Sequence, residues 1–193
     1  MMGRLRLAGL LLIAIAVGVF LASAVVPAAE PPKPPSLDAV PGSETISDTA
    51  ADPDGGAPWA LRLYTSTSGA ACSELGRLDH GTFGTIDQNG VFSPVPLEDG
   101  GTCGDLHAEP AVIAVNRYPE TVRRPGRTVV FGQVAQNVTA ITVTSAGGMA
   151  TAASGAQGGF LAPMEGDDLV SALSVTITFD DKTTHTYRFT RLP

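Results

Sequence analysis

The chain has 193 residues, with 12 lysines and arginines against 19 aspartates and glutamates and a formal net charge of −7. Nucleic acids and anionic lipid surfaces are bound by clustered cations, so this acidic composition argues against both as partners. The one basic cluster, Arg123–Arg127, lies in a Pro/Gly turn and is interpreted as a solvated loop.

The N-terminal residues predict a membrane anchor. Arg4 and Arg6 precede an uncharged run, Leu7–Val26, in which only Ser23 is polar. As a helix rising ~1.5 Å per residue, this run reaches about 30 Å, the thickness of a hydrocarbon core. The arginines on its N-terminal side keep that end in the cytoplasm. We therefore expect residues 1–26 to form a single-pass helix in the cell membrane, with the rest of the chain outside the cytoplasm.

The alternative is a cleaved signal peptide and a secreted protein. Ala22-Ser23-Ala24 offers small residues for a signal-peptidase site, and Val26-Pro27-Ala28 is a poorer second choice. The apolar run is longer than the ~7–15 residues usual for a signal peptide, which favours retention. Both outcomes stay open at this point.

Residues 27–58 are rich in proline and contain few large apolar side chains. Eight prolines fall in this span, and Glu30–Pro35 predicts an extended polyproline stretch. Such a composition buries too little apolar surface to offset the entropy of ordering the chain. We expect residues 27–58 to be a disordered linker that separates the folded part from the membrane.

From residue 59 onward, short β-rich segments alternate with glycine, proline and aspartate turns, a pattern typical of an all-β sandwich of antiparallel strands. The remaining length suits one such unit, 59–193, or two sub-halves, 59–124 and 125–193, that share an interface. The expected strands are Trp59–Thr65, Thr82–Ile86, Val91–Val95, Ala111–Val115, Thr128–Phe131, Ala140–Thr144, Leu173–Phe179 and Thr184–Phe189.

Two of the turns predict hairpins. Asn89-Gly90 lies between two β-rich runs, and Asn-Gly is the strongest short-range hairpin signal. Asp180–Lys182 separates the last two strands. The segment around Asp87 also resembles the centre of a calcium loop, but Thr85 and Pro96 occupy the positions of its two anchoring carboxylates. A hairpin turn is therefore the preferred interpretation.

Cys72 and Cys103 are the only cysteines, and an even count in an exported chain predicts a disulfide. The alternative is a metal site: Cys72, His80, Cys103 and His107 would supply four zinc ligands. The spacing of its first pair is unlike common zinc motifs, and thiolates outside the cytoplasm usually oxidise. We expect the disulfide, and neither a metal nor a cofactor.

The last third of the chain carries a resemblance. Val130–Val134, Val138–Thr144 and Gly158–Leu161 resemble a pattern common in exported actinobacterial proteins. The same residues are loosely similar to transthyretin-like and carboxypeptidase-regulatory-like β-sandwiches. This resemblance implies a sandwich fold and an exported setting, and it transfers no catalytic residues.

The sequence lacks two common catalytic motifs. There is no G-x-S-x-G nucleophile motif and no glycine-rich phosphate loop followed by Lys-Ser/Thr. Paired carboxylates for glycoside chemistry stay open, because their distances cannot be deduced from the sequence. The leading hypothesis is a non-catalytic envelope module with a binding or structural role, whose partner is another envelope protein or polymer. The alternative is a secreted enzyme, or an enzyme accessory, that acts on an envelope polymer.

Overall fold

The computed structural model describes residues 38–87, 89–96, 101–121, 125–145, 148–152, 158–166 and 173–189. The elements in these ranges are β-strands in antiparallel sheets, which confirms the expected all-β class. The helix expected over residues 1–26 lies outside the described residues. Within the described ranges, no helix has the length and apolar character needed to span a membrane.

The first sheet contains six strands in the order β1-β2-β3-β4-β5, and β6 pairs with β3 outside this path. Its strands are β1 (Thr45–Ala50), β2 (Trp59–Thr65), β3 (Ala71–Asp79), β4 (Thr82–Ile86), β5 (Phe92–Pro94) and β6 (Thr102–Gly104).

The other two sheets are smaller. The three-stranded sheet has the order β11-β8-β7, and the four-stranded sheet has the order β10-β9-β12-β13. Their strands are β7 (Ala111–Tyr118), β8 (Arg127–Val134), β9 (Val138–Ser145), β10 (Gly148–Ala152), β11 (Gly159–Glu165), β12 (Leu173–Phe179) and β13 (Thr184–Phe189).

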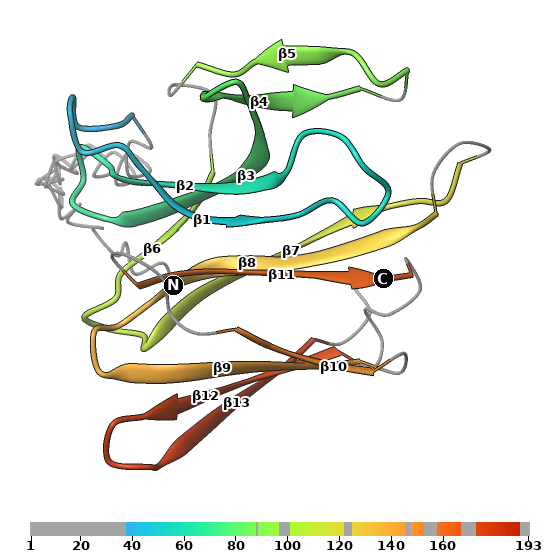
Figure 1. The fold of residues 1–193 in the computed structure, drawn as a ribbon. Coiled ribbons are helices and arrows are strands. Elements are labelled where there is room, and N and C mark those ends of the chain that lie inside the picture. Colours follow the sequence, from blue (N-terminus) through green and yellow to red (C-terminus); the bar gives the residue numbers. More distant parts are fainter. Residues whose placement is uncertain are drawn as a thin grey trace, which may run out of the picture. The chain divides into compact units, whose positions relative to one another are not determined.

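The β11-β8-β7 sheet lies between the other two, as Figure 1 shows. Strand β8 makes this arrangement possible, because its side chains are buried on both faces. Val129 and Phe131 pack with residues of the first sheet, whereas Val130 and Val134 pack with residues of the four-stranded sheet. A near-continuous apolar run is what a strand covered on both faces requires.

Two cores result. The core between the first and middle sheets is built around Trp59, Leu61 and Leu63 of β2. The larger core, between the middle and four-stranded sheets, includes Phe160 of β11 and Ile177 of β12, both fully buried. These two layers of apolar side chains hold the three sheets together.

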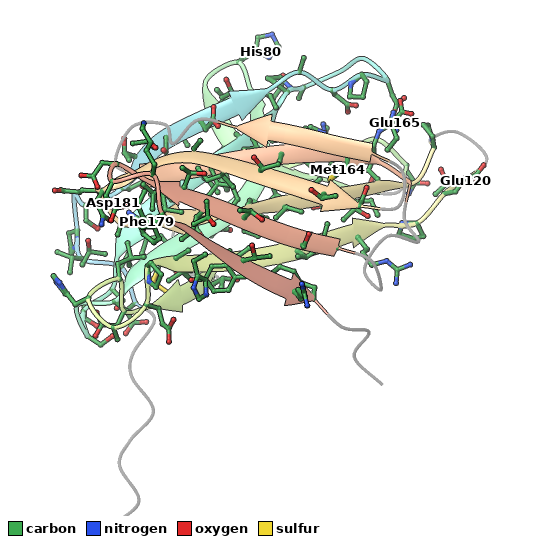
Figure 2. The ribbon with its side chains drawn as sticks, turned by 90° about the horizontal axis from the view of Figure 1, so that it is seen from below. His80, Glu120, Met164, Glu165, Phe179 and Asp181 are labelled. Atoms are coloured by element: carbon green, nitrogen blue, oxygen red, sulfur yellow. A yellow bond between two sulfur atoms is a disulfide. The ribbon has the colours of Figure 1, made fainter. Side chains whose placement is uncertain are left out.

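Both predicted hairpins are confirmed. Strands β4 and β5 pair around the Asn89-Gly90 turn, where Gly90 has a φ of +86°. Strands β12 and β13 pair around Asp180–Lys182. Figure 2 shows Phe179 and Asp181 at this end of the strands, with Glu120 and Glu165 at the opposite end.

The linker prediction is wrong for the described part of residues 27–58. Strand β1 lies inside that span and pairs with β2 from Thr45 to Ala50. Its own side chains are mostly small and polar, so the ordering comes from its neighbours. The edge of β2 supplies hydrogen-bond partners for the backbone of β1. Strand β1 also packs closely against β11: a side chain added at Gly159 of β11 would overlap Ser47 of β1.

Two paired strands lie on either side of the expected boundary between the sub-halves 59–124 and 125–193. Strand β7 precedes residue 124 and β8 follows it, and the two pair along their whole length from Ala111↔Val134 to Tyr118↔Arg127. The described residues, all of which lie between 38 and 189, belong to one compact unit by their contacts.

Candidate functional site

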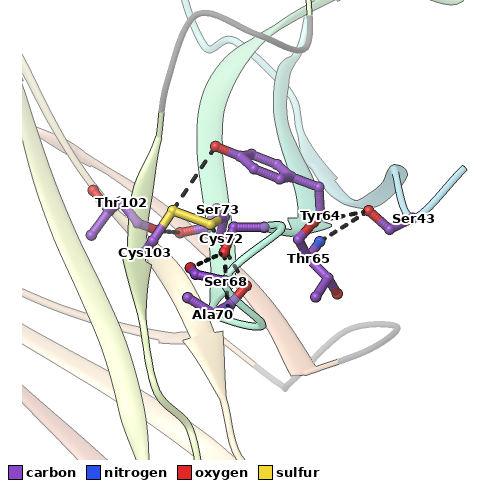
Figure 3. The surroundings of a disulfide bond; sticks show 10 residues. Ser43, Tyr64, Thr65, Ser68, Ala70, Cys72, Ser73, Thr102 and Cys103 are labelled. Carbon is purple, nitrogen blue, oxygen red and sulfur yellow. Dashed lines mark hydrogen bonds between the residues drawn. A yellow bond between two sulfur atoms is a disulfide. The ribbon is translucent and has the colours of Figure 1, made fainter. Parts of the chain in front are cut away.

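The predicted disulfide is present. Cys72 on β3 lies directly opposite Cys103 on β6, and their sulfur atoms are bonded at 2.03 Å (Figure 3). The Tyr64 hydroxyl lies 3.9 Å from the Cys103 sulfur. The bond fixes the short β6 strand onto the first sheet.

The alternative metal set is not assembled. Both of its thiols are joined in the disulfide, so they supply no thiolate ligands. The His80 side chain is 94% exposed on the β3–β4 turn, where its Nδ1 lies 2.9 Å from Asp79. Within the described ranges, no group of three or more His, Cys, Asp or Glu side chains is arranged to hold a metal ion.

The segment that resembles a calcium loop is organised as a turn. Asp87 Oδ1 accepts hydrogen bonds from the backbone N–H groups of Asn89 at 2.9 Å and Val91 at 2.8 Å. The bond from Val91 contributes most to holding the pKa of Asp87 below its ordinary value. The carboxylate is thus engaged in the hairpin turn.

Three arginines of the described chain are buried, and they differ in how fully their N–H groups are bonded. Arg62 of β2 donates five hydrogen bonds. Two go to Glu74, one to Glu44, and one each to the carbonyl oxygens of Val95 and Pro96. A guanidinium has five N–H donors, so Arg62 has the number of bonds that a buried structural arginine needs.

Arg77 of β3 is held between a carboxylate and an aromatic ring. Its Nη1 donates to Asp52 at 2.6 Å and to the carbonyl oxygen of Ala57 at 2.9 Å. Its guanidinium carbon lies 3.2 Å from the centre of the Trp59 ring, its cross-strand neighbour on β2. This geometry combines a buried ion pair with a cation–π contact.

Arg127 of β8 is the least completely bonded of the three. Its Nη2 donates to Asp54 at 2.9 Å, and its Nη1 lies 3.9 Å from the exposed Glu165 carboxylate. Its Nε has no acceptor among the described residues, and the same is true of the indole nitrogen of Trp59. Buried N–H donors without partners are rare in folded proteins.

These groups meet at matching ends of two sheets. In the middle sheet, Tyr118, Arg127 and Glu165 lie side by side on β7, β8 and β11. In the first sheet, Trp59 and Arg77 are directly opposite each other. The rings of Trp59 and Tyr118 connect the two rows, with their centres 4.9 Å apart.

A cavity of about 210 Å³ lies at this end of the strands. The β1–β2 loop contributes its two aspartates to the wall, and Ile86 and Asp87 contribute from the end of β4. Burial raises the pKa of the Tyr118 phenol above its ordinary 10.0, against the opposing effects of Asn116 and Arg77. The cavity therefore combines an aromatic wall with paired charges, whereas the two unsatisfied N–H donors of its lining side chains are buried within the protein.

A second, more open hollow of about 600 Å³ lies near the other end of β2 and β8. Its wall includes His107 and Asp105, where the Asp105 side chain accepts a hydrogen bond from the His107 backbone N–H at 2.8 Å. It therefore contains one residue of the alternative metal set. The described part of its wall includes neither a buried charge nor a phenylalanine, tyrosine or tryptophan ring.

The cavity residues were not predicted from the sequence. Asp52 and Asp54 fell inside the segment interpreted as a linker, and Arg77 belongs to a strand that was not expected. Arg127 was placed in the solvated basic cluster, but it is buried, which corrects that interpretation for this residue. The other two arginines of the cluster, Arg123 and Arg124, lie outside the described ranges.

Comparison of the chain with protein-family models, with curated proteins and with solved structures finds no match. The resemblance to transthyretin-like and carboxypeptidase-regulatory-like sandwiches thus stays a prediction.

Proposed function

We propose that this protein is a non-catalytic binding module that works outside the cytoplasm, tethered to the cell membrane by a helix at residues 1–26. The observation that carries the binding role is the cavity between Trp59, Tyr118 and Arg127. It combines an apolar wall with a few polar groups, the usual composition of a small-molecule site.

The Cys72–Cys103 disulfide supports the extracytoplasmic setting. Disulfides persist in oxidising compartments and are rare in the cytosol. The apolar run at Leu7–Val26 supports the anchor, because its length matches the hydrocarbon core of a bilayer. The net charge beyond the run is −9, which favours a partner other than nucleic acid or an anionic membrane surface.

The experiment that tests compartment and tether is the intact mass of the native protein from membranes, cytosol and medium, with and without reductant. We expect the full-length chain in the membrane fraction and a gain of two hydrogens on reduction. Recovery of a reduced, full-length chain from the cytosol would contradict the proposal. A chain that begins near Val25 and is found in the medium would remove the tether and favour a secreted enzyme or enzyme accessory.

A further inference from the structure

We propose that the cavity of about 210 Å³ binds a primary alkylammonium group, with the ammonium against Asp54 and the alkyl chain against Tyr118. This group belongs to free alkylamines and to lysine side chains. The inference rests on the proposed binding function and names the chemical class of its ligand. Three features of the described wall support it: its more exposed charges are acidic, an aromatic residue is partly open, and the cavity is small.

The more exposed charged groups of the described wall are carboxylates. The wall contains two arginines and three aspartates, a formal charge of −1; they are Arg77, Arg127, Asp52, Asp54 and Asp87. Both arginine side chains are only 8% exposed and already have carboxylate partners. The Asp54 side chain is 26% exposed, and Asp87 is an exposed residue. This distribution repels an anionic ligand and attracts a cationic one.

Asp54 retains an oxygen for a ligand. Its Oδ1 accepts the hydrogen bond from Arg127 Nη2 at 2.9 Å, and no donor among the described residues bonds to its Oδ2. An ammonium is a compact donor that can bond to a single oxygen, whereas a guanidinium makes its strongest contact with both oxygens of one carboxylate. Because Oδ1 is already bonded, Asp54 suits an ammonium better than a further guanidinium.

The apolar part of the wall suits an alkyl chain. It is formed by Trp59, Ile86, Tyr118, Pro119 and Pro125. Tyr118 is 37% exposed, so the Trp59 ring covers this residue only in part. The methylene groups of an alkylammonium can lie along such a surface, and its charge is attracted to the face of an aromatic ring. Sites for drug-sized ligands have about 300–1,000 Å³, so this smaller cavity suits one side chain or a short amine.

Binding is measured by titration into the full-length protein, followed by the fluorescence of Trp59, which lines the cavity and is the only tryptophan. The probes n-pentylammonium and Nα-acetyl-lysine methylamide carry the proposed group. The alcohol 1-pentanol keeps the alkyl chain without the charge, and pentanoate reverses the charge. We expect saturable binding of at least one ammonium probe, with a rise in Tm of about 3–6 °C at ten times Kd. Pentanol and pentanoate should bind at least about fivefold more weakly.

The two ammonium probes distinguish the sources of the ligand. Tighter binding of the lysine derivative supports the proposal with a polypeptide as the source. Tighter binding of pentylammonium supports it with a free amine as the source.

Two carboxylates near Arg127 provide matched variants. Asp54→Asn removes the proposed partner of the ammonium, so the affinity for the ammonium probe should fall at least about fivefold. Glu165 lies near the same arginine but is not among the described residues that line the cavity, so Glu165→Gln should leave the affinity unchanged. Urea unfolding verifies that both variants are folded. If the two variants bind the probe equally well, the assignment of Asp54 is overturned.

The native protein provides a test that needs no substitution. Raising the salt concentration from about 0.05 M to about 0.5 M screens exposed charges, so the affinity for the ammonium probe should fall while that for pentanol does not. An affinity for the ammonium probe that does not depend on salt would contradict the proposed ion pair.

The remaining outcomes also decide the matter. Equal or tighter binding of pentanol or pentanoate would overturn the ammonium assignment while leaving a binding module in place. Absence of binding by all four compounds would overturn both the assignment and the cavity as the binding site. Failure of the proposed compartment is recognised separately, by a reduced chain in the cytosol.

Discussion

The ion pair between Arg77 and Asp52 is expected to contribute strongly to stability. Its atoms lie 2.6 Å apart, and the two side chains are 8% and 6% exposed. Asp52→Asn removes the negative charge and leaves a buried guanidinium, a change that costs about 3–5 kcal/mol in comparable pairs. The Ala57 carbonyl and the Trp59 ring still contact Arg77, so we expect a loss near 3 kcal/mol.

Two neighbouring carboxylates provide matched controls, because their exposure increases in steps. Asp54 pairs with Arg127 but is 26% exposed, so Asp54→Asn should cost about 1–2 kcal/mol. Glu165 is 89% exposed and 3.9 Å from the same arginine, so Glu165→Gln should change stability by less than about 0.5 kcal/mol. The order of the three losses follows the degree of burial.

Urea unfolding of the full-length protein, followed by Trp59 fluorescence, measures these differences. A loss of about 3 kcal/mol corresponds to a fall in Tm of about 6–12 °C for a folded unit of this size. The reasoning is refuted if Asp52→Asn costs no more than Glu165→Gln. A changed dependence on urea would instead indicate an altered unfolded or native state, so the slope is compared across all variants.

Other parts of the structure yield three further expectations. Replacement of both cysteines by alanine should lower the free energy of unfolding by about 3.5 kcal/mol, because the disulfide joins residues 31 apart in the sequence. Reductant should lower the Tm of the native protein but not that of this double variant. Gly132→Ala should lower the free energy of unfolding in urea by at least about 2 kcal/mol, because the added Cβ would overlap the Val112 carbonyl oxygen. Gly42→Ala is the control: a Cβ added there meets no atom, so this variant should lose less stability. The free energy of unfolding should fall above pH 10, because burial raises the pKa values of all three tyrosines and the unfolded chain therefore ionises first. Urea unfolding at constant temperature and increasing pH measures this fall, and these groups should cause no loss of stability below pH 10. The tyrosines are Tyr64, Tyr118 and Tyr187.

Local patterns in the sequence were sufficient to predict several strands. Strand β2 has the predicted bounds, and the last hairpin pairs Leu173 with Phe189 and Val175 with Tyr187, as its alternation indicates. These segments each contain large apolar side chains on one face, so burial and strand formation favour the same structure.

Strands that depend on their neighbours were missed. Strand β1 has no run of large apolar side chains and is ordered by β2 and β11. In β3, Gly76 weakens the strand pattern, yet it is needed because a side chain there would overlap Phe83. The strand preference of a residue type does not predict such strands, because that preference depends on the surrounding sheet.

The residues of the candidate site could not be predicted from the sequence for a different reason. Asp52 and Arg77 are 25 residues apart, and Asp54 and Arg127 are 73 residues apart. Single-sequence patterns do not indicate which distant charges will be buried together. The disulfide was predictable because only two cysteines exist to pair, whereas many acids and bases offer many pairings.

The enclosed position of β8 has a consequence for hydrogen exchange. This strand is bonded to β7 and β11 along its edges and covered by a core on each face. Its inner amides can meet solvent only when the layers separate, so their exchange rates should report the free energy of global unfolding. Among the described strands, β13 pairs with β12 alone, and it is largely exposed, so it should exchange through local fraying. The slowest amides of the molecule should therefore lie in the strand whose first residue, Arg127, forms part of the cavity wall.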